Sequence, residues 1–262
     1  INARTFMEPN LIEKIKLFKK NRNQAIIQDG QVLCCLLQDQ AIDHFWNLLK
    51  TIPSNKSLCN SLKNDSILSS CEASIIRSWN DVFALQKKAI YLDQQEFQMG
   101  LFKGKTPHFL SSINDKAIAI KKDCFIEDFV TLDARKGPIL IDEHVYIQSH
   151  SRIEGPSYIG PNCILKGGHF SEIVAGPMCK LHGEISKSIF QEFTNKAHEG
   201  FIGNSYIGKW VNLGAGSTNS NLNLNYKNPY FEPNGTQIES NEPFFGTIIG
   251  DHVKTAIGAL IN

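Results

Sequence analysis

The 262-residue sequence has no excess of charge of either sign and no long apolar run. It contains 27 Lys and Arg against 26 Asp and Glu, which gives a formal net charge of +1. A chain so balanced has no overall field that would attract nucleic acid or an anionic membrane surface. No apolar run reaches the roughly eighteen residues that a membrane-spanning helix needs. We therefore expect no nucleic-acid partner and no membrane partner.

The sequence also lacks paired cysteines and a secretory leader. Its seven cysteines are odd in number and form no CxxC pair, so neither a disulfide framework nor a thiolate zinc site is expected. The first residues, INARTFMEPNL, lack the charged and apolar regions of a signal peptide. We expect a cytoplasmic protein with reduced cysteines. Because the sequence does not begin with Met, it suggests a fragment or a domain of a longer chain.

The first hundred residues carry the pattern of an α/β domain without a phosphate-binding loop. Apolar spacing predicts helices over residues 11–18, around 41–49 and over 75–92, and Asp29-Gly30 predicts a hairpin between strands within residues 24–37. Neither GxGxxG nor GxxxxGK[ST] is present. These residues are too few for a complete doubly wound sheet. We place a domain at residues 1–110 and a linker near 105–115.

From Ile120 onward, apolar residues recur with a period of six. Small or β-branched residues tend to follow four positions after each of these anchors. A helix would need a period of 3.6 and a flat strand a period of two. A period of six residues indicates a coil with three six-residue faces. Residues 111–262 are therefore predicted to form a β-helix of about six or seven coils. The anchors are Ile120, Ile126, Leu132, Ile141, Ile147, Ile153, Ile159, Leu165, Ile207, Leu213, Asn219 and Ile249.

The stretch from His198 to Lys227 combines short glycine turns with a small set of polar residues. Ile207–Gly216 reads IGKWVNLGAG. The stretch resembles the acetyltransferase half of the bifunctional family that makes UDP-N-acetylglucosamine, in which a uridylyltransferase is fused to a glucosamine-1-phosphate acetyltransferase. That family has a catalytic His, an aromatic residue three positions later, an Asn at twenty-three and a Lys at twenty-nine. His198, Phe201, Asn221 and Lys227 occupy those offsets.

The resemblance implies a fold, an activity and roles for these residues. It implies a left-handed parallel β-helix, a homotrimer, and acetyl-CoA-dependent N-acetylation of a hexosamine 1-phosphate. His198 would be the general base, since an imidazole titrates near neutrality. Asn221 and Phe201 would contact the sugar, Lys227 would neutralise its phosphate, and the N–H of Ala215 would contact acetyl-CoA.

The sequence departs from that family at several positions. Phe201 stands where the family has Tyr, and Ile257 stands where it has a Ser near the thioester. Residues 228–246 are an insertion. Two upstream basic residues of the family fall on Gly168 and Ser186, so Arg152, Lys166 or Lys187 would have to supply that charge, and we include Lys187 among the substrate-binding candidates.

The first hundred residues resemble the end of a sugar nucleotidyltransferase domain, in which an "INAR" strand end precedes a helix. With no nucleotide loop present, we do not assign nucleotidyl transfer to this chain. We expect Mg²⁺ only if an intact nucleotidyltransferase domain precedes it. The overall prediction is a mainly β protein, a left-handed β-helix preceded by a partial α/β segment.

Two other kinds of function remain open on the sequence alone. One is a non-catalytic β-helix that serves as scaffold or regulatory domain of a sugar-1-phosphate nucleotidyltransferase, since a fold does not fix a function. The other is a γ-class carbonic anhydrase, which holds zinc with three His. Its H-x4-H spacing is absent, because His144 and His150 are six residues apart, although His169, His182 and His198 could converge across coils.

Overall fold

The computed structural model describes residues 5–19, 22–29, 31–38, 42–43, 67–99, 101–102, 107–231, 237–240 and 242–261. The chain folds into two compact units, Ile1–Asp81 and Val82–Asn262. The division lies about thirty residues before the linker expected near 105–115. Part of that expected linker, Ser111–Ile113, instead forms strand β5 of the second unit. The helix predicted around 41–49 falls outside the described residues except at 42–43.

The first unit contains one helix and a small mixed sheet. Helix α1 (Pro9–Lys16) begins with Pro at its first turn, a position where a missing N–H costs nothing. Strands β1 (Gln24–Gln28) and β2 (Gln31–Leu36) form the predicted antiparallel hairpin, with Asp29 at φ 49°. Strand β3 (Ile67–Ser70) pairs parallel with β1. The α/β content is therefore confirmed, while the likeness to a nucleotidyltransferase stays a prediction.

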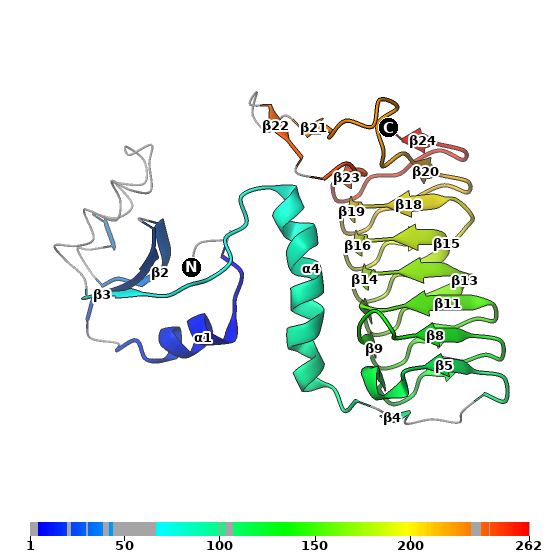
Figure 1. Cartoon of the computed structure of the whole chain (residues 1–262), viewed down its shortest axis with the longest axis horizontal. Coiled ribbons are helices and arrows are strands. Elements are labelled where there is room, and N and C mark those ends of the chain that lie inside the picture. The colour runs from blue at the N-terminus through cyan, green and yellow to red at the C-terminus, as the bar shows by residue number, and fades with distance from the viewer. Residues whose placement is uncertain are drawn as a thin grey trace. The chain divides into compact units, whose positions relative to one another are not determined.

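The second unit is a parallel β-helix, as predicted (Figure 1). One face is an eight-stranded parallel sheet. Its strands, in stacking order, are β4 (Leu101–Phe102), β6 (Ile118–Ile120), β9 (Ile139–Ile141), β12 (Ser157–Ile159), β14 (Val174–Ala175), β16 (Ile189–Phe190), β19 (Tyr206–Ile207) and β23 (Ile248–Ile249).

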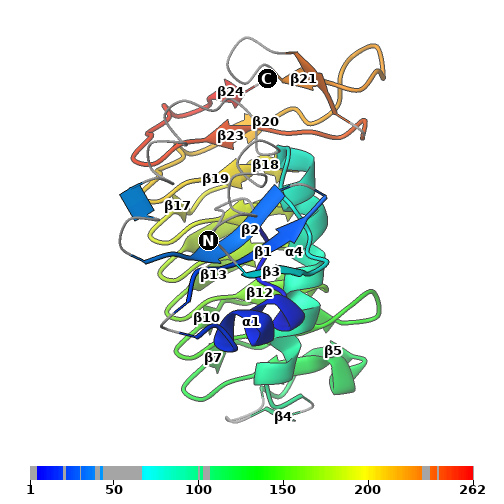
Figure 2. The same ribbon diagram turned by 90° about the vertical axis from the view of Figure 1, so that its left-hand side faces the viewer.

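Two further faces complete each coil. One carries β7 (Phe125–Ile126) and β10 (Tyr146–Ile147), which follow one another up the stack (Figure 2), and continues to β17 (Asn195–Lys196). The other carries β5, β8 (Thr131–Asp133), β11 (Ser151–Glu154) and β18 (Phe201–Gly203). Two long strands, β13 (Ile164–Ser171) and β15 (Lys180–Ser186), run along both faces.

The region from Gly167 to Lys196, in which the sequence has no anchors at a period of six, is part of the coil and runs from within β13 to the end of β17. The register between β13 and β15 shifts between Leu165 and Gly168, and this shift interrupts the period of six. Gly168 and Gly183 lie at φ 109° and 97°, which L side chains rarely adopt. A bulged glycine corner, rather than a loss of structure, therefore hides the repeat.

The core confirms the predicted anchors. Every anchor from Ile120 to Ile249 is buried, and eight of the twelve are at most 1% exposed. Stacked Ile side chains at about 25 cal/mol per Å² contribute roughly 2 kcal/mol each. Of the small residues predicted four places after the anchors, Val130, Val145 and Cys163 are buried, whereas Val253 in the last coil is exposed.

One helix belongs to the β-helix unit rather than to the first. Helix α4 (Trp79–Asp93) is the helix predicted at 75–92, and it starts later because the Asp81 carboxylate accepts from the N–H groups of Arg77 and Ser78. Its Ile90 packs against Ala119 and Leu140 of the coil. This packing explains why the compact unit begins at Val82.

The 228–246 insertion leaves the coil as a separate hairpin. Strands β21 (Tyr230–Phe231) and β22 (Ile238–Glu239) pair antiparallel. The chain then returns to the coil, where Phe245 N–H donates to the Asn221 carbonyl at 2.9 Å. Strands β20 (Thr218–Asn219), before the insertion, and β24 (Leu260–Ile261), after it, pair in parallel.

Candidate active site

The residues of the predicted site gather on the upper coils of the β-helix. His198 lies in the exposed turn between β17 and β18. Phe201 is the first residue of β18, and both its backbone N–H and its carbonyl are hydrogen-bonded to the hydroxyl of Thr218. Thr218 Oγ1 accepts from the Phe201 N–H at 3.2 Å and donates to the Phe201 carbonyl at 3.1 Å. The backbone that carries the aromatic side chain is therefore fixed even though β18 is short.

Phe201 and Asn221 lie against the same glycine. A Cβ at Gly203 would be 2.7 Å from Nδ2 of Asn221 and closer still to the Phe201 ring. Asn221 Nδ2 donates to Oδ1 of Asn204 at 2.9 Å, which orients the amide. Because Gly203 has no side chain, the Phe201 ring and the Asn221 amide can both lie against its backbone.

The anchor position that contacts Gly203 holds a polar residue instead of an aliphatic one. Asn219 occupies an anchor position and is 5% exposed. Its Oδ1 accepts from the Gly203 N–H at 2.9 Å and its Nδ2 donates to the Gly203 carbonyl at 3.2 Å. Because buried backbone groups must be paired, an Asn here satisfies the Gly203 backbone where an aliphatic anchor could not.

The turn that carries His198 has each of its four successive carbonyls bonded. Lys166 Nζ donates to the Ala197 carbonyl at 3.5 Å, and Lys196 Nζ donates to the His198 carbonyl. The Glu199 carbonyl accepts from Gly216 N–H at 3.0 Å, and the Gly200 carbonyl accepts from Glu184 N–H at 3.3 Å. Since Gly216 follows Ala215, the predicted acetyl-CoA contact lies beside the histidine turn.

A second histidine supports the same turn. His182 Nε2 lies 2.8 Å from Oε1 of Glu199, and its Nδ1 lies 3.0 Å from the Gly167 carbonyl. Both ring nitrogens therefore face acceptors. The sequence marked His182 only as a possible zinc ligand, and it gave no sign of Glu199 or Lys196. The described residues contain no group of three or more His, Cys, Asp or Glu that could hold a metal ion.

The two lysines predicted to bind the substrate differ in position. Lys187 follows β15 in a left-handed corner at φ 42°, and Asn204, the next corner up, has φ 48°. The Asn204 N–H donates to the Ser186 carbonyl at 3.0 Å, so Lys187 lies one coil from the amide that holds Asn221. Lys227 is exposed in the loop after Asn221, where its N–H donates to Asn225 Oδ1 at 3.0 Å.

A cavity of about 670 Å³ opens beside Asn221. It involves the residues on either side of this amide and the base of the insertion. Its lining is neutral, with amides and aromatic rings, and is made by Ser220, Leu222, Asn223, Leu224, Asn225, Pro229, Tyr230, Phe245 and Gly246. Volumes of this size are typical of small-molecule sites.

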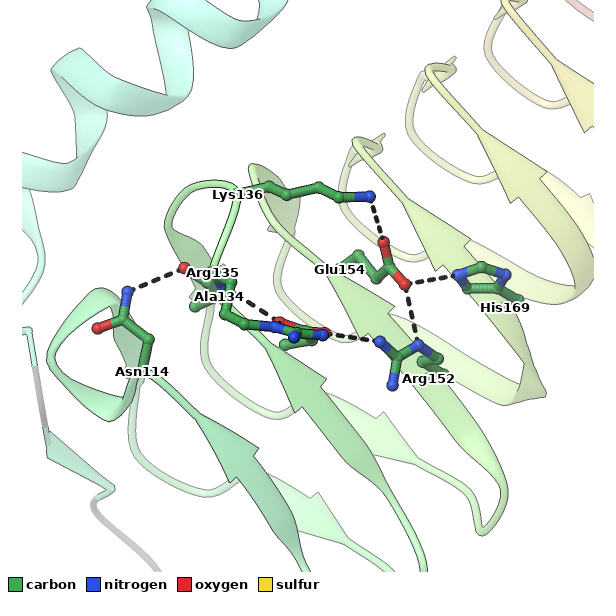
Figure 3. A network of polar contacts seen from close by, with 8 residues as sticks. Asn114, Ala134, Arg135, Lys136, Arg152, Glu154 and His169 are labelled. Atoms are coloured by element: carbon green, nitrogen blue, oxygen red, sulfur yellow. Dashed lines mark hydrogen bonds and ion pairs between the residues drawn. The ribbon is translucent and has the colours of Figure 1, made fainter.

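Arg152, one of the three cations that could have supplied the upstream basic charge, is already paired (Figure 3). Its Nη2 lies 2.6 Å from Asp133 Oδ2 and its Nε lies 2.9 Å from Glu154 Oε1. Arg135 also bonds Asp133, and these guanidinium groups, Arg135 first, hold the pKa of the Asp133 carboxyl well below its usual range. Burial raises the pKa of Glu154, but bonds from Lys136 and Arg152 outweigh it and lower the pKa.

His169 completes this outer-face network, with Nε2 at 3.3 Å from Glu154 Oε1 (Figure 3). In register, Arg152 stacks on His169, His169 on Glu184 and Glu184 on Phe201. The charged network thus lies on the same strand faces as the site but several coils away, and its acids are satisfied internally.

Comparison with known proteins gives relatives of one kind. The chain is 32% identical over 142 residues to a bifunctional sugar-1-phosphate nucleotidylyltransferase/acetyltransferase of Sulfurisphaera tokodaii, which is 52% of this chain and 34% of that protein. It is 32% identical over 115 residues, 43% of the chain and 25% of the relative, to the bifunctional protein GlmU of Gloeothece citriformis. The GlmU of Thermotoga petrophila is 37% identical over 79 residues, 30% of the chain and 18% of the relative.

These matches agree with the family that the sequence resembles. The chain matches about a third or less of the length of these relatives. No protein-family model matches the chain. Among the described residues, no helix has the length and apolarity required to cross a membrane.

Proposed function

We propose that this chain is a transferase of sugar-nucleotide biosynthesis that moves the acetyl group of acetyl-CoA to the amine of a hexosamine 1-phosphate. The observation that carries the proposal is the meeting of Phe201 and Asn221 at Gly203, one short strand after the exposed His198. The Sulfurisphaera tokodaii relative supports it, since its name joins acetyl transfer to sugar-1-phosphate chemistry.

The proposed reaction uses His198 as the general base. The amine nitrogen attacks the thioester carbon and the C–N bond forms, which leaves a tetrahedral oxyanion. The C–S bond then breaks and CoA leaves as a thiolate. His198 takes the proton that the amine loses and returns it to the departing sulfur, so that atoms and charge balance.

The acceptor sugar would lie between Asn221 and the neighbouring cavity. The Asn221 amide, already oriented by Asn204, offers a hydrogen bond to a sugar hydroxyl, and the Phe201 ring offers an apolar face. The cavity's neutral lining of amides and aromatic side chains is suited to a sugar ring. Its lining supplies no charge for the phosphate.

Lys187 is the cation best placed to bind the sugar phosphate. Arg152 is committed to two carboxylates and Lys166 to the Ala197 carbonyl. Lys187 is exposed and lies one coil below Asn204, the residue whose side chain holds the Asn221 amide. An ammonium on a flexible stem binds phosphate as a point charge. We retain Lys227, at the end of its loop, as a second phosphate ligand.

Acetyl-CoA would approach from the side of Ala215. Residues 214–216 form a Gly-Ala-Gly turn, and the Gly216 N–H already contacts the Glu199 carbonyl. This bond joins the residue after Ala215, the proposed CoA contact, to the residue after His198, the proposed base. We further propose a homotrimer in the cytoplasm. The free state of the six described cysteines fits a reducing compartment.

A thiol-release assay with acetyl-CoA and glucosamine 1-phosphate tests this function. We expect acetyl-dependent release of CoA that requires the amino sugar and yields an N-acetylated product by mass spectrometry. Binding of the sugar phosphate without any CoA release would favour the scaffold or regulatory alternative.

A further inference from the structure

Lys196 occupies a position where the fold otherwise places aliphatic side chains. In the inner row of its face, Ile126, Ile147, Leu165 and Leu181 stack in register, and Lys196 is the next residue up. Leu213, in the following coil, is buried as well. Yet Lys196 is 1% exposed and ranks among the largest fully buried side chains of the described residues.

A buried ammonium is costly unless it is paired or hydrogen-bonded. Lys196 Nζ donates to the backbone carbonyl of His198, two residues further along the chain. The side chain therefore runs inside the coil and turns back to the corner that its own strand leads into. A Cβ at Gly183, in the coil below, would lie 3.4 Å from this Nζ, so the glycine corner leaves room for it.

The charged groups around this ammonium either belong to the same turn or contact it. The Glu199 carboxylate is the opposite charge that acts on it, and Glu199 is itself paired with His182. Lys166 bonds the preceding carbonyl from the outside. An inward lysine and an outward lysine thus hold adjacent carbonyls of one exposed turn.

We infer that Lys196 is a positioning residue, whose buried ammonium fixes the turn that presents His198. The inference rests on the proposed function, because His198 matters only if it is the base. Leucine at this position would fill the same row at lower cost but would leave the His198 carbonyl without its donor. The lysine therefore lowers the stability of the fold but fixes the turn that carries His198.

The test compares Lys196→Met with Leu181→Met, a matched substitution of the residue directly below that carries no charge. Amide exchange at Gly216 and Glu184 reports the turn, since these N–H groups bond the Glu199 and Gly200 carbonyls. We expect exchange at both amides to accelerate roughly tenfold or more in Lys196→Met and to stay unchanged in Leu181→Met. Unchanged exchange in a folded Lys196→Met overturns the inference.

Kinetics provide the second readout. We expect kcat of Lys196→Met to fall roughly tenfold with KM for both substrates unchanged, because the turn is displaced but the substrate contacts remain. Faster exchange with unchanged kcat would limit Lys196 to a structural role and contradict the inference. A wild-type chain without acetyl transfer would refute the proposed function, while the exchange result would still decide whether Lys196 holds the turn.

The unaltered chain offers a test that does not depend on a variant's folding. Asn195 N–H donates to the Val211 carbonyl within the neighbouring coil. If the turn is held as inferred, Gly216 and Glu184 should be protected as well as Asn195. Fraying of those two amides at rates far above that of Asn195 would contradict a fixed turn.

Discussion

The amide of Asn221 donates from Nδ2 to Oδ1 of Asn204 at 2.9 Å, and so joins the loop after the last regular coil to the corner below it. This bond, with Gly203 between Asn221 and Phe201, brings together an oriented amide and an aromatic ring on the coil whose turn exposes His198. If this arrangement is an acetyl-transfer site, changes to its parts should lower the rate of acetyl transfer.

Substituting Gly203 tests the meeting point itself. In Gly203→Ala, the new Cβ would lie 2.7 Å from Asn221 Nδ2 and closer to the Phe201 ring, so both must move. We expect kcat/KM to drop roughly tenfold or more, equivalent to about 1.4 kcal/mol, with a stability loss of about 1–3 kcal/mol from overpacking. Gly250→Ala is the control, since a Cβ there meets no atom within 4 Å.

Removing the charge of Lys187 tests the phosphate contact. We expect Lys187→Met to raise KM for the sugar phosphate about tenfold, as one charge-assisted hydrogen bond contributes about 1.5–3 kcal/mol, with kcat little changed. Lys180→Met, an exposed lysine on β15, serves as control. If Lys227→Met raises KM and Lys187→Met does not, the phosphate lies on the loop side instead.

Deleting a central anchor tests what stabilises the β-helix. Ile153 is completely buried and stacks between Leu132 and Phe170. Ile153→Ala should lower the free energy of unfolding by about 2–5 kcal/mol through lost burial and a cavity. The exposed Ile257 provides the comparison: chemical denaturation of Ile257→Ala should show a change within about 0.5 kcal/mol. Equal losses would mean that the aliphatic rows are not the core.

The buried Lys196 predicts a particular dependence of stability on pH. Burial lowers the pKa of Lys196 to about 8 from an ordinary 10.5, while Glu199 opposes the shift. Between pH 8 and 10.5 the unfolded chain binds more protons at this residue than the folded chain, so the free energy of unfolding rises with pH. The penalty for burying the charged form is present below pH 8 and is relieved above it.

Urea denaturation at several pH values measures this effect as a difference. Subtracting the values for Lys196→Met removes what the two proteins have in common, including the other charged groups at this turn, Glu199, His182 and Lys166. We expect wild type minus variant to rise by up to about 1 kcal/mol per pH unit over that window. A flat difference would show that the ammonium is solvated in the folded chain.

The fold could be read from the sequence where the period of six is unbroken. Ile141 to Leu165 repeat without interruption, and these anchors alone require a three-faced coil. The period failed between Gly167 and Lys196 because the register shift at Leu165/Gly168 changes the spacing between anchors without ending the coil. A charged residue, Lys196, also occupies an inner position there, and no hydrophobic pattern could reveal it.

The site was predicted less completely than the fold. Phe201 and Asn221 were predicted from the offsets that they share with the family the sequence resembles, but their convergence depends on Gly203 and on Asn204 one coil away, which no sequence pattern shows. The second histidine, His182, stacks near Glu199 only because coils bring residues about seventeen positions apart into contact. Arg152 could not be discounted as a phosphate ligand until its two carboxylate partners were known.

The rate of acetyl transfer by His198→Ala is the most direct test of the account. CoA release from acetyl-CoA in the presence of glucosamine 1-phosphate would be compared among wild type, His198→Ala and His252→Ala, an exposed histidine in a left-handed corner near the end of the coil. Loss of a general base predicts a drop of at least about 100-fold for His198→Ala and none for His252→Ala. Equal rates for all three would remove His198 from the mechanism and contradict the proposed chemistry.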